Sequence, residues 1–291
     1  MLPPGEAIKE TAGKIWPAPA KLNLFLHVTG RRADGYHDLQ TLFQILDWGD
    51  ELSFEINASG HVGRCGNIAG VPEQDDICVR AAHLLKSRCG VTQGVQITLK
   101  KRIPMGAGLG GGSSDAATVL SVLNRLWSCG LSRRQLAELG LELGADVPVF
   151  VNGYSAWAEG RGEKLQAVTL GPRHYVLVFP EVSISTAEIF AHPSLKRDSE
   201  PVEMSPDRLG PGRNDCTPVV LHLYPELRRL VEELSAWGEP QMSGTGSTFF
   251  LSFDTKKNAI EAASELECRY NVRPVSGVDR SDLLRNLSAE L

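Results

Sequence analysis

Five glycines and two serines crowd one short stretch of the chain, IPMGAGLGGGSSDAA at residues 103–117. Glycine lets backbone amides converge on an anion because it carries no side chain, and serine adds hydroxyl donors. A helix is expected to begin directly after the glycines, with Ser113 or Ser114 as its cap and Asp115 in its first turn. The free amides and positive dipole end of such a helix attract anions. The stretch therefore favours phosphate binding; the alternative is a glycine-rich turn with a packing role.

Two better-known glycine motifs do not fit this stretch. GxGxxG (Gly106, Gly108, Gly111) is the dinucleotide fingerprint, which directly follows a strand and needs an acid at the end of a second strand. Here Pro104 separates strand from loop, and helical patterns follow instead of a second strand. A Walker A loop requires a lysine after its last glycine, where this chain has Ser113.

Two charged residues in apolar surroundings are candidates for chemistry on a bound phosphate. Lys21 lies in the strand pattern APAKLNLFL, where a lysine either reaches solvent at an edge or points into a site. Asn23 lies two residues further on, and therefore on the same strand face. Asp146 in LGADVPVF precedes an apolar run that we expect to be a strand. It is either an ordinary turn residue or a carboxylate at a cleft.

Composition and charge restrict the class of protein. The 291 residues are 42% hydrophobic and 22% charged, as in globular proteins with one large or two smaller domains. The net charge of -5 and pI near 5.8 argue against nucleic acid or an anionic membrane as main partner. The six scattered cysteines, without CxxC, favour reduced thiols over disulfides or a zinc site. We expect a cytoplasmic protein without membrane spans, as a monomer or weak homodimer.

The hydrophobic patterns mix strands and helices without regular alternation, which indicates an α+β fold. In the first half we expect a loose leader, a strand over 18–30 and two strands within 41–57, joined at Trp48-Gly49-Asp50. Helices are expected over 75–90, 113–130 and 131–144, followed by two short strands around Asn152-Gly153. In the second half we expect strands over 174–180 and 247–253, a helix over 256–270 and a last strand over 271–278. A polar, turn-rich segment divides the chain into predicted domains at 1–165 and 166–291.

The glycine stretch resembles the phosphate-binding motif of the GHMP kinases, a superfamily of small-molecule kinases. PAPAKLNLFLHVTGRRADGYHDLQTLFQ, LGADVPVF and SGTGST resemble one branch of it, so that the matching motifs spread from residue 17 to about 250. The resemblance implies ATP-dependent phosphorylation of the 2-hydroxyl of 4-diphosphocytidyl-2-C-methyl-D-erythritol, in non-mevalonate isoprenoid synthesis, with Mg²⁺ beside ATP. It also implies an N-terminal domain like the second domain of ribosomal protein S5 and a ferredoxin-like C-terminal domain.

The same resemblance implies roles for individual residues. Lys21 and Asp146 form the catalytic pair, with Asp146 as base. The implied ATP-binding residues are Pro104, Met105, Gly106, Ala107, Gly108, Leu109, Gly110, Gly111, Gly112, Ser113 and Ser114, with Asp76 and Lys101. The substrate-binding candidates are Asn23, Tyr36, His37, Phe43, Thr186 and Phe190. The second small-residue loop, at 243–247, is implied to pack against the glycine stretch.

Two features depart from the pattern of that branch. The branch commonly has an adenine-pocket asparagine where this chain has Asp76, and an aspartate accepts hydrogen bonds but cannot donate them. The segment GRCGNIAGVPEQ at 63–74 matches no motif. For Mg²⁺ no cluster with metal-ligand spacing is visible; Ser114 and Asp115 are candidates, and neither is assigned.

Two other functions stay open on the sequence. One is a GHMP kinase of the mevalonate or homoserine type, which the segment Gly35-Tyr36-His37 disfavours because those substrates carry no base to stack. The other is a non-catalytic module that binds a nucleotide or RNA. The acidic pI and the presence of both Lys21 and Asp146 weigh against that module.

Overall fold

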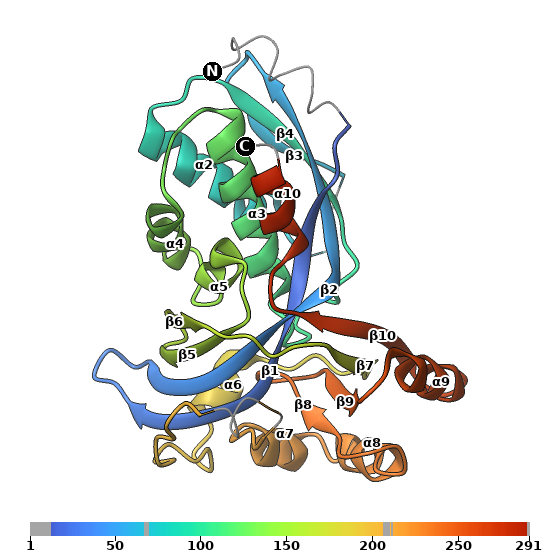
Figure 1. Ribbon diagram of the computed structural model, residues 1–291. Coiled ribbons are helices and arrows are strands. Elements are labelled where there is room, and N and C mark those ends of the chain that lie inside the picture. Colours follow the sequence, from blue (N-terminus) through green and yellow to red (C-terminus); the bar gives the residue numbers. More distant parts are fainter. Residues whose placement is uncertain (1–12, 67–69, 206–209, 211, 290–291) are drawn as a thin grey trace.

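The computed structural model describes residues 13–66, 70–205, 210 and 212–289, so the predicted leader lies almost wholly outside it (Figure 1). Its strands are β1 (Trp16–Arg31), β2 (His37–Asn57), β3 (Val62–Cys65), β4 (Gly94–Lys100), β5 (Ala156–Gly160), β6 (Lys164–Ala167), β7 (Arg173–Phe179), β8 (Gln241–Met242), β9 (Phe249–Phe253) and β10 (Asn271–Val278). Its α-helices are α2 (Ile77–Cys89), α3 (Gly111–Leu126), α4 (Arg133–Leu141), α5 (Val147–Asn152), α6 (Thr186–Ala191), α7 (Thr217–Leu223), α8 (Glu226–Leu234), α9 (Lys256–Leu266) and α10 (Asp282–Ala289). The predicted α+β class is confirmed. None of these helices is long and apolar enough to cross a membrane.

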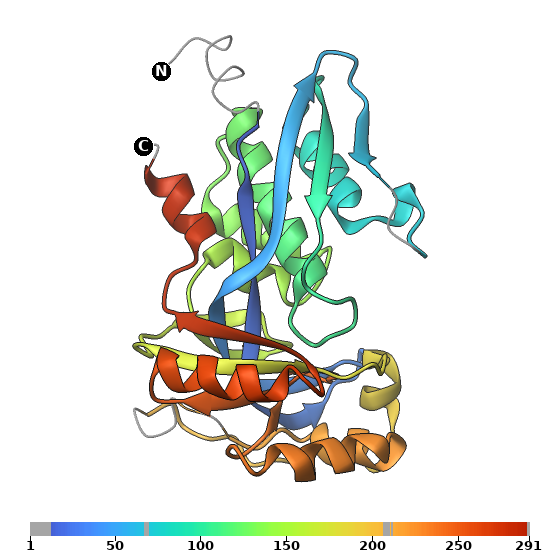
Figure 2. The same ribbon diagram turned by 90° about the vertical axis from the view of Figure 1, so that its right-hand side faces the viewer.

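The strands of the described residues form one ten-stranded sheet, with β3-β4-β2-β10-β7-β9-β8 as its main path. Strand β2 is its centre, because it pairs with β1, β4, β5 and, briefly, with β10. The pairing of β10 with β2 spans only two residue pairs, whereas its pairing with β7 spans seven. This short contact joins the part of the sheet around β2 to the part around β7. Helices α2 to α5 gather on one side of the long strands (Figure 1), and α9 lies across β7 and β10 (Figure 2).

Three apolar clusters form the interior. One lies among β1, β2, β4 and helices α2 to α5, and the second among β7, β9 and helices α6 to α9. The third, which includes Leu22, Leu109 and Phe250, connects elements of both halves. The chain crosses between the halves at both ends, since Leu26 of β1 belongs to the second cluster and Leu283 of α10 to the first. The division at residue 165 stays a prediction.

The prediction of two strands joined at Trp48-Gly49-Asp50 is wrong, because β2 continues without a break from His37 to Asn57. Gly49 is needed for a close approach of β1 to β2 and not for a turn. A Cβ atom at Gly49 would lie 2.0 Å from the carbonyl oxygen of Ala18 and 2.6 Å from the Cα atom of Pro19. The sequence pattern marks the glycine but does not reveal the strand that pairs so closely with it.

Two other local predictions are corrected. Helix α3 begins at Gly111, with Gly110 as its N-cap and without a side-chain cap, so Ser113 and Ser114 lie in the first turn. Residues 147–152 form helix α5 and not a strand. Pro148 suits the first turn of a helix, where its missing N–H costs nothing, and Gly153 ends the helix in the left-handed region at φ 69°. The helix expected over 131–144 is confirmed as α4, which Ser132 caps.

We expect Gly49→Ala to lower the free energy of unfolding by about 1–3 kcal/mol, the usual cost of overpacking. The new methyl group would force the backbones of β1 and β2 apart. Gly30→Ala is the matched control in the same strand pair, where the added Cβ would come no closer than 3.7 Å to Asp38. Urea unfolding of both variants measures the difference. Equal stabilities would show that the backbones of β1 and β2 do not approach closely at Gly49.

Candidate active site

One cleft of about 1070 Å³ contains the predicted site. Its lining includes every candidate residue from the sequence except Ser114, which is fully buried. One part of the lining comes from the start of α2 and the end of β4. A second part comes from the glycine stretch with Lys21 and Asp146, and a third from the start of β2 with α6. The fold therefore brings together residues that are more than a hundred positions apart in the sequence.

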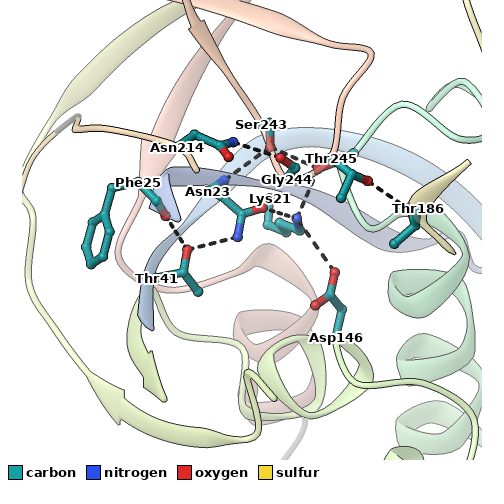
Figure 3. A network of polar contacts seen from close by, with 11 residues as sticks. Lys21, Asn23, Phe25, Thr41, Asp146, Thr186, Asn214, Ser243, Gly244 and Thr245 are labelled. Atoms are coloured by element: carbon teal, nitrogen blue, oxygen red, sulfur yellow. Dashed lines mark hydrogen bonds and ion pairs between the residues drawn. The ribbon is translucent and has the colours of Figure 1, made fainter. Parts of the chain in front are cut away.

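Lys21 lies in the middle of β1 with only 3% of its surface exposed (Figure 3). Its ammonium group donates to the carbonyl oxygen of Gly108 at 3.0 Å and to Oδ1 of Asn23, and it lies 3.6 Å from Oδ2 of Asp146. Burial lowers the pKa of Lys21, while the neighbouring Asp146 carboxylate opposes that shift. The three oxygen partners compensate for the water that the lysine loses.

Asp146 is the N-cap residue of α5, and its carboxylate makes no cap hydrogen bond with the helix. Its side chain is 33% exposed and lines the cleft, in contrast to the buried lysine beside it. The carboxylate is thus oriented by Lys21 from one side and open to the cleft on the other. The strand expected after Asp146 is absent. The helix α5 takes its place, and its N-cap position puts Asp146 at the cleft.

The glycine stretch contains backbone amides that have no acceptor among the described residues. Among the described residues no protein acceptor pairs with a backbone amide between Gly108 and Ser113, whereas the amide of Ser114 donates to Gly110. The amides of Gly111, Gly112 and Ser113 belong to the first turn of α3, where no intrahelical acceptor exists. Free amides at the positive end of a helix dipole can bind an anion, so these residues are a candidate anion cradle.

The glycines in this stretch differ in whether neighbouring atoms leave room for a side chain. A Cβ atom at Gly108 would lie 2.2 Å from the carbonyl oxygen of Ser243, and one at Gly110 would lie 2.8 Å from the ring of Phe150. At Gly106 and Gly112 the nearest atom would be at 3.7 Å or more. Gly108 and Gly110 therefore have the packing role that the sequence left open. Gly106 and Gly112 are the positions with room for a ligand.

The loop at 243–247 packs against the glycine stretch, as the resemblance implied. Ser243 donates from Oγ to the carbonyl oxygen of Gly108 at 2.9 Å and accepts from the amide of Asn23 at 3.1 Å. Asn214, which the sequence analysis missed, donates to the carbonyl oxygens of Met242 and Gly244 (Figure 3). The hydroxyl of Thr186 lies 2.9 Å from that of Thr245 and so connects α6 to the same loop.

Lys101 is held between two buried carboxylates at the end of β4. Its ammonium group lies 2.6 Å from Asp50 and 2.7 Å from Asp115. Burial raises the pKa of Asp115 to about 7, with Lys101 opposing the shift and Asp50 adding to it. Oδ1 of Asp115 and Oγ of Ser114 are buried without a hydrogen-bond partner among the described residues. Lys101 lines the cleft, but Asp50 and Asp115 already neutralise the charge of its ammonium group.

The two departures from the family pattern meet in one ion pair. Asp76 caps α2 through Oδ1, which accepts from the amide of Cys78 at 2.8 Å. Its Oδ2 lies 2.8 Å from Nε of Arg64, and both side chains are 3% exposed. Arg64 comes from the unmatched segment at 63–74 and was missed because the sequence does not show which carboxylate it pairs with. Asp76 thus lines the cleft with both of its oxygens engaged.

The third part of the cleft is aromatic and cationic. The rings of His37 and Phe190 stack at 5.2 Å between centroids and 28° between planes. Tyr36 is 56% exposed, with the guanidinium of Arg161 over its ring at 5.0 Å. Arg31 and Arg161 also line the cleft and were missed, although Arg161 stands out in the sequence between two glycines.

Two substrate-binding candidates lie nearer to Lys21 than to these rings. Phe43 pairs with Asn23 across the strands and has the ammonium group of Lys21 5.4 Å from its ring centroid. Phe43 lies six positions after His37 in β2, or roughly 20 Å along an extended strand. The Asn23 amide is engaged with Lys21 and with Thr41, to which Nδ2 donates at 2.9 Å. These two residues surround the lysine.

Comparison with known proteins gives the same family for both halves of the chain. The profile described as GHMP kinases N terminal domain matches residues 76–154, and the one described as GHMP kinases C terminal matches residues 204–272. The first match contains the glycine stretch and Asp146. The second contains the loop at 243–247.

Curated proteins and solved structures are similar over nearly the whole chain. A 4-diphosphocytidyl-2-C-methyl-D-erythritol kinase of Nitrosococcus oceani is 49% identical over 93% of this chain and 96% of its own length. One of Pseudomonas paraeruginosa is 53% identical over 86% of this chain and 89% of its own. A crystal structure of 4-(cytidine 5'-diphospho)-2C-methyl-D-erythritol kinase is 34% identical, with a TM-score of 0.79 over 91% of this chain and 99% of that chain. A homoserine kinase of Cytophaga hutchinsonii, 14% identical with a TM-score of 0.67 over 92% of this chain and 95% of its own, shares the fold.

We expect Arg64→Met to destabilise the protein by about 3–5 kcal/mol, because it leaves the buried Asp76 carboxylate without its cation. Asp76→Asn in the same chain should recover most of that loss, since asparagine caps a helix as well as aspartate does and carries no charge. Urea unfolding of both single variants and the double variant measures the coupling. Additive losses would contradict a direct pair.

Proposed function

Because this chain belongs to the 4-diphosphocytidyl-2-C-methyl-D-erythritol kinases of the GHMP superfamily, we propose that it phosphorylates the 2-hydroxyl of 4-diphosphocytidyl-2-C-methyl-D-erythritol with ATP. The reaction is a step of the non-mevalonate pathway to isoprenoid precursors. The observation that carries the proposal is the single cleft, in which an anion cradle, a buried lysine beside an open carboxylate, and an aromatic surface follow one another. These are the parts needed to hold a nucleoside triphosphate, an alcohol and a nucleobase.

Asp146 is proposed as the base. Phosphoryl transfer needs an oriented hydroxyl whose proton is accepted as the oxygen attacks the γ-phosphorus. The Asp146 carboxylate faces the cleft, and Lys21 at 3.6 Å fixes its orientation. Once the hydroxyl proton has moved to Asp146, the attacking oxygen bonds to phosphorus and the bond to the ADP oxygen breaks.

Lys21 is proposed to stabilise charge in the transition state. Its ammonium group is fixed by Gly108 and Asn23 before the substrate arrives, so no reorganisation is required during the reaction. A fixed positive charge in a site sheltered from water acts strongly on the negative charge that develops on the transferred group. Asn23 and Phe43 are accordingly assigned to the surroundings of Lys21, beside the reacting hydroxyl.

The glycine stretch is proposed to bind the ATP phosphates. The free amides from Gly108 to Ser113 supply the donors, and the open space at Gly106 and Gly112 gives the phosphates access to the backbone. The purine is assigned to the part of the cleft near Asp76 and Lys101. With both carboxylate oxygens of Asp76 engaged, backbone groups read the base there.

Mg²⁺ is proposed to bind together with ATP, because it neutralises the charge of the ATP phosphates. A carboxylate oxygen suits a hard cation, and Asp115 lines the cleft while its buried Oδ1 has no hydrogen-bond partner among the described residues. No group of three or more His, Cys, Asp or Glu side chains that could hold a metal exists in the described ranges, which suits an ion held mainly by phosphates and water. Asp115, with Ser114 beside it, would hold the ion.

The aromatic part of the cleft is proposed to bind the cytidylyl group. Tyr36, His37 and Phe190 offer ring faces and one polar edge, while Thr186 lies at the start of the same helix as Phe190. Arg31 and Arg161 would offset the charge of the substrate diphosphate. The cytoplasm is proposed as the location, supported by six free cysteines, and a monomer or weak homodimer without nucleic acid as the working form.

The experiment that tests this function is phosphorylation of a substrate panel. The protein is incubated with ATP, Mg²⁺ and one of three compounds: the cytidylyl methylerythritol compound, mevalonate or homoserine. The molecular masses of the products are measured by mass spectrometry. A gain of one phosphoryl group by the cytidylyl compound alone is expected. Phosphorylation of mevalonate or homoserine instead, or RNA binding in a gel shift without any turnover, would overturn the proposal.

We expect Asp146→Ala to abolish measurable turnover, a loss of at least about 10²–10⁴ in kcat for a missing base, with ATP binding unchanged. Lys21→Met should lower kcat by about 10²–10³, since one fixed transition-state charge is lost. Asp254→Asn, at an exposed turn before α9, is the control for changing an aspartate. An active Asp146→Ala enzyme would contradict the assignment of Asp146 as the base. A near-normal rate for Lys21→Met would show that Lys21 has only a structural role.

A further inference from the structure

Behind His37 lies an arginine that does not line the cleft. Nε of Arg197 donates to Nε2 of His37 at 3.1 Å. The same guanidinium donates to the backbone carbonyl oxygens of Phe190 at 2.9 Å, His192 at 2.8 Å and Leu195 at 3.2 Å. One side chain thus fixes both His37 and the end of α6, whose Phe190 ring stacks on the imidazole.

The bond from Arg197 determines which hydrogen-bonding group His37 can offer. A guanidinium stays protonated and has no acceptor, so the ring nitrogen that meets it must accept. His37 is then neutral and carries its proton on Nδ1. Burial lowers the pKa of His37, and the charges of Arg197 and Arg31 lower it further, in keeping with a neutral ring. Among the described residues Nδ1 has no hydrogen-bond partner, which leaves it to a ligand in the cleft.

We propose that Arg197 is a positioning residue that fixes His37 as an Nδ1–H donor and thereby makes the cleft select cytosine over uracil. This inference rests on the proposed function, because it takes the cytidylyl group as the ligand of His37. Cytosine has an acceptor at N3, whereas uracil has an N–H donor there. A donor that cannot change its tautomer pairs with cytosine N3 and meets a second donor in uracil, and leaving a buried polar group unpaired is costly.

The first test is the tautomer itself, read by ¹⁵N–¹H NMR of the imidazole in the whole protein. The wild type should show a proton on Nδ1 and none on Nε2, with the signal assigned by its loss in His37→Gln. Arg197→Met should release the ring to the other tautomer or a mixture. Arg197→Lys keeps a cationic donor and should keep Nδ1–H. Arg213→Met is the control, since Arg213 pairs with Asp215 and donates to Ser199 instead.

The second test is base selection. The ratio of kcat/KM for the cytidylyl substrate to that for its uridylyl analogue should fall at least about tenfold in Arg197→Met, the effect of one hydrogen bond, through KM of the cytidylyl compound and not of ATP. Arg197→Lys should retain the ratio. An Nε2–H or charged ring in the wild type, or an unchanged ratio in Arg197→Met, overturns the inference.

The two tests separate failure of this inference from failure of the proposed function. If the cytidylyl compound is not a substrate, the tautomer is still measured by NMR, and binding of CDP against UDP replaces the kinetic ratio. If Arg197→Met does not fold, Arg197→Lys and the wild type still test the inference, because both must show Nδ1–H. A wild-type protein that binds CDP and UDP equally would contradict it.

Discussion

A buried lysine in the middle of a strand is the constraint around which the rest of the site is arranged. Lys21 gives up its water, and the fold must supply oxygen partners from elsewhere. They come from three places: Asn23 on the same strand, the carbonyl group of Gly108 and the carboxylate of Asp146. Holding Lys21 therefore also fixes where the glycine stretch and the start of α5 can lie.

The same constraint explains why small residues gather here. The glycine stretch must approach Lys21 and the loop at 243–247 closely, and a side chain at Gly108 would enter the backbone of Ser243. Ser243 in turn donates to Gly108 and accepts from Asn23, so the second half of the chain closes the network that begins in β1. The cleft is thus built at a junction of both halves, and the first residues of α3 line it directly after the loop that Ser243 holds.

Part of this candidate site could be predicted from the sequence: the glycine stretch stands out by residue type, whereas Lys21 and Asp146 each kept an ordinary alternative until the family resemblance implied their roles. Local geometry was less predictable. The valine-rich run after Asp146 has the composition of a strand, whereas Pro148 in its first turn and the left-handed Gly153 at its end are the features of a short helix. Gly49 indicated a turn, while in the structure it permits a close approach of the paired strand β1. Arg64 and Arg197 could not be found, because pairing across 12 and 160 positions leaves no local pattern.

The most direct test of the central claim, that Lys21 and Asp146 act as one unit, is the single-turnover rate of the Lys21→Met/Asp146→Asn double variant beside the two single variants. Residues that act as a unit lose their effect together. The double variant should therefore be within about threefold of the slower single variant. If instead the two losses in rate multiply, lysine and aspartate contribute independently, and the ion pair seen in the cleft does not organise the reaction.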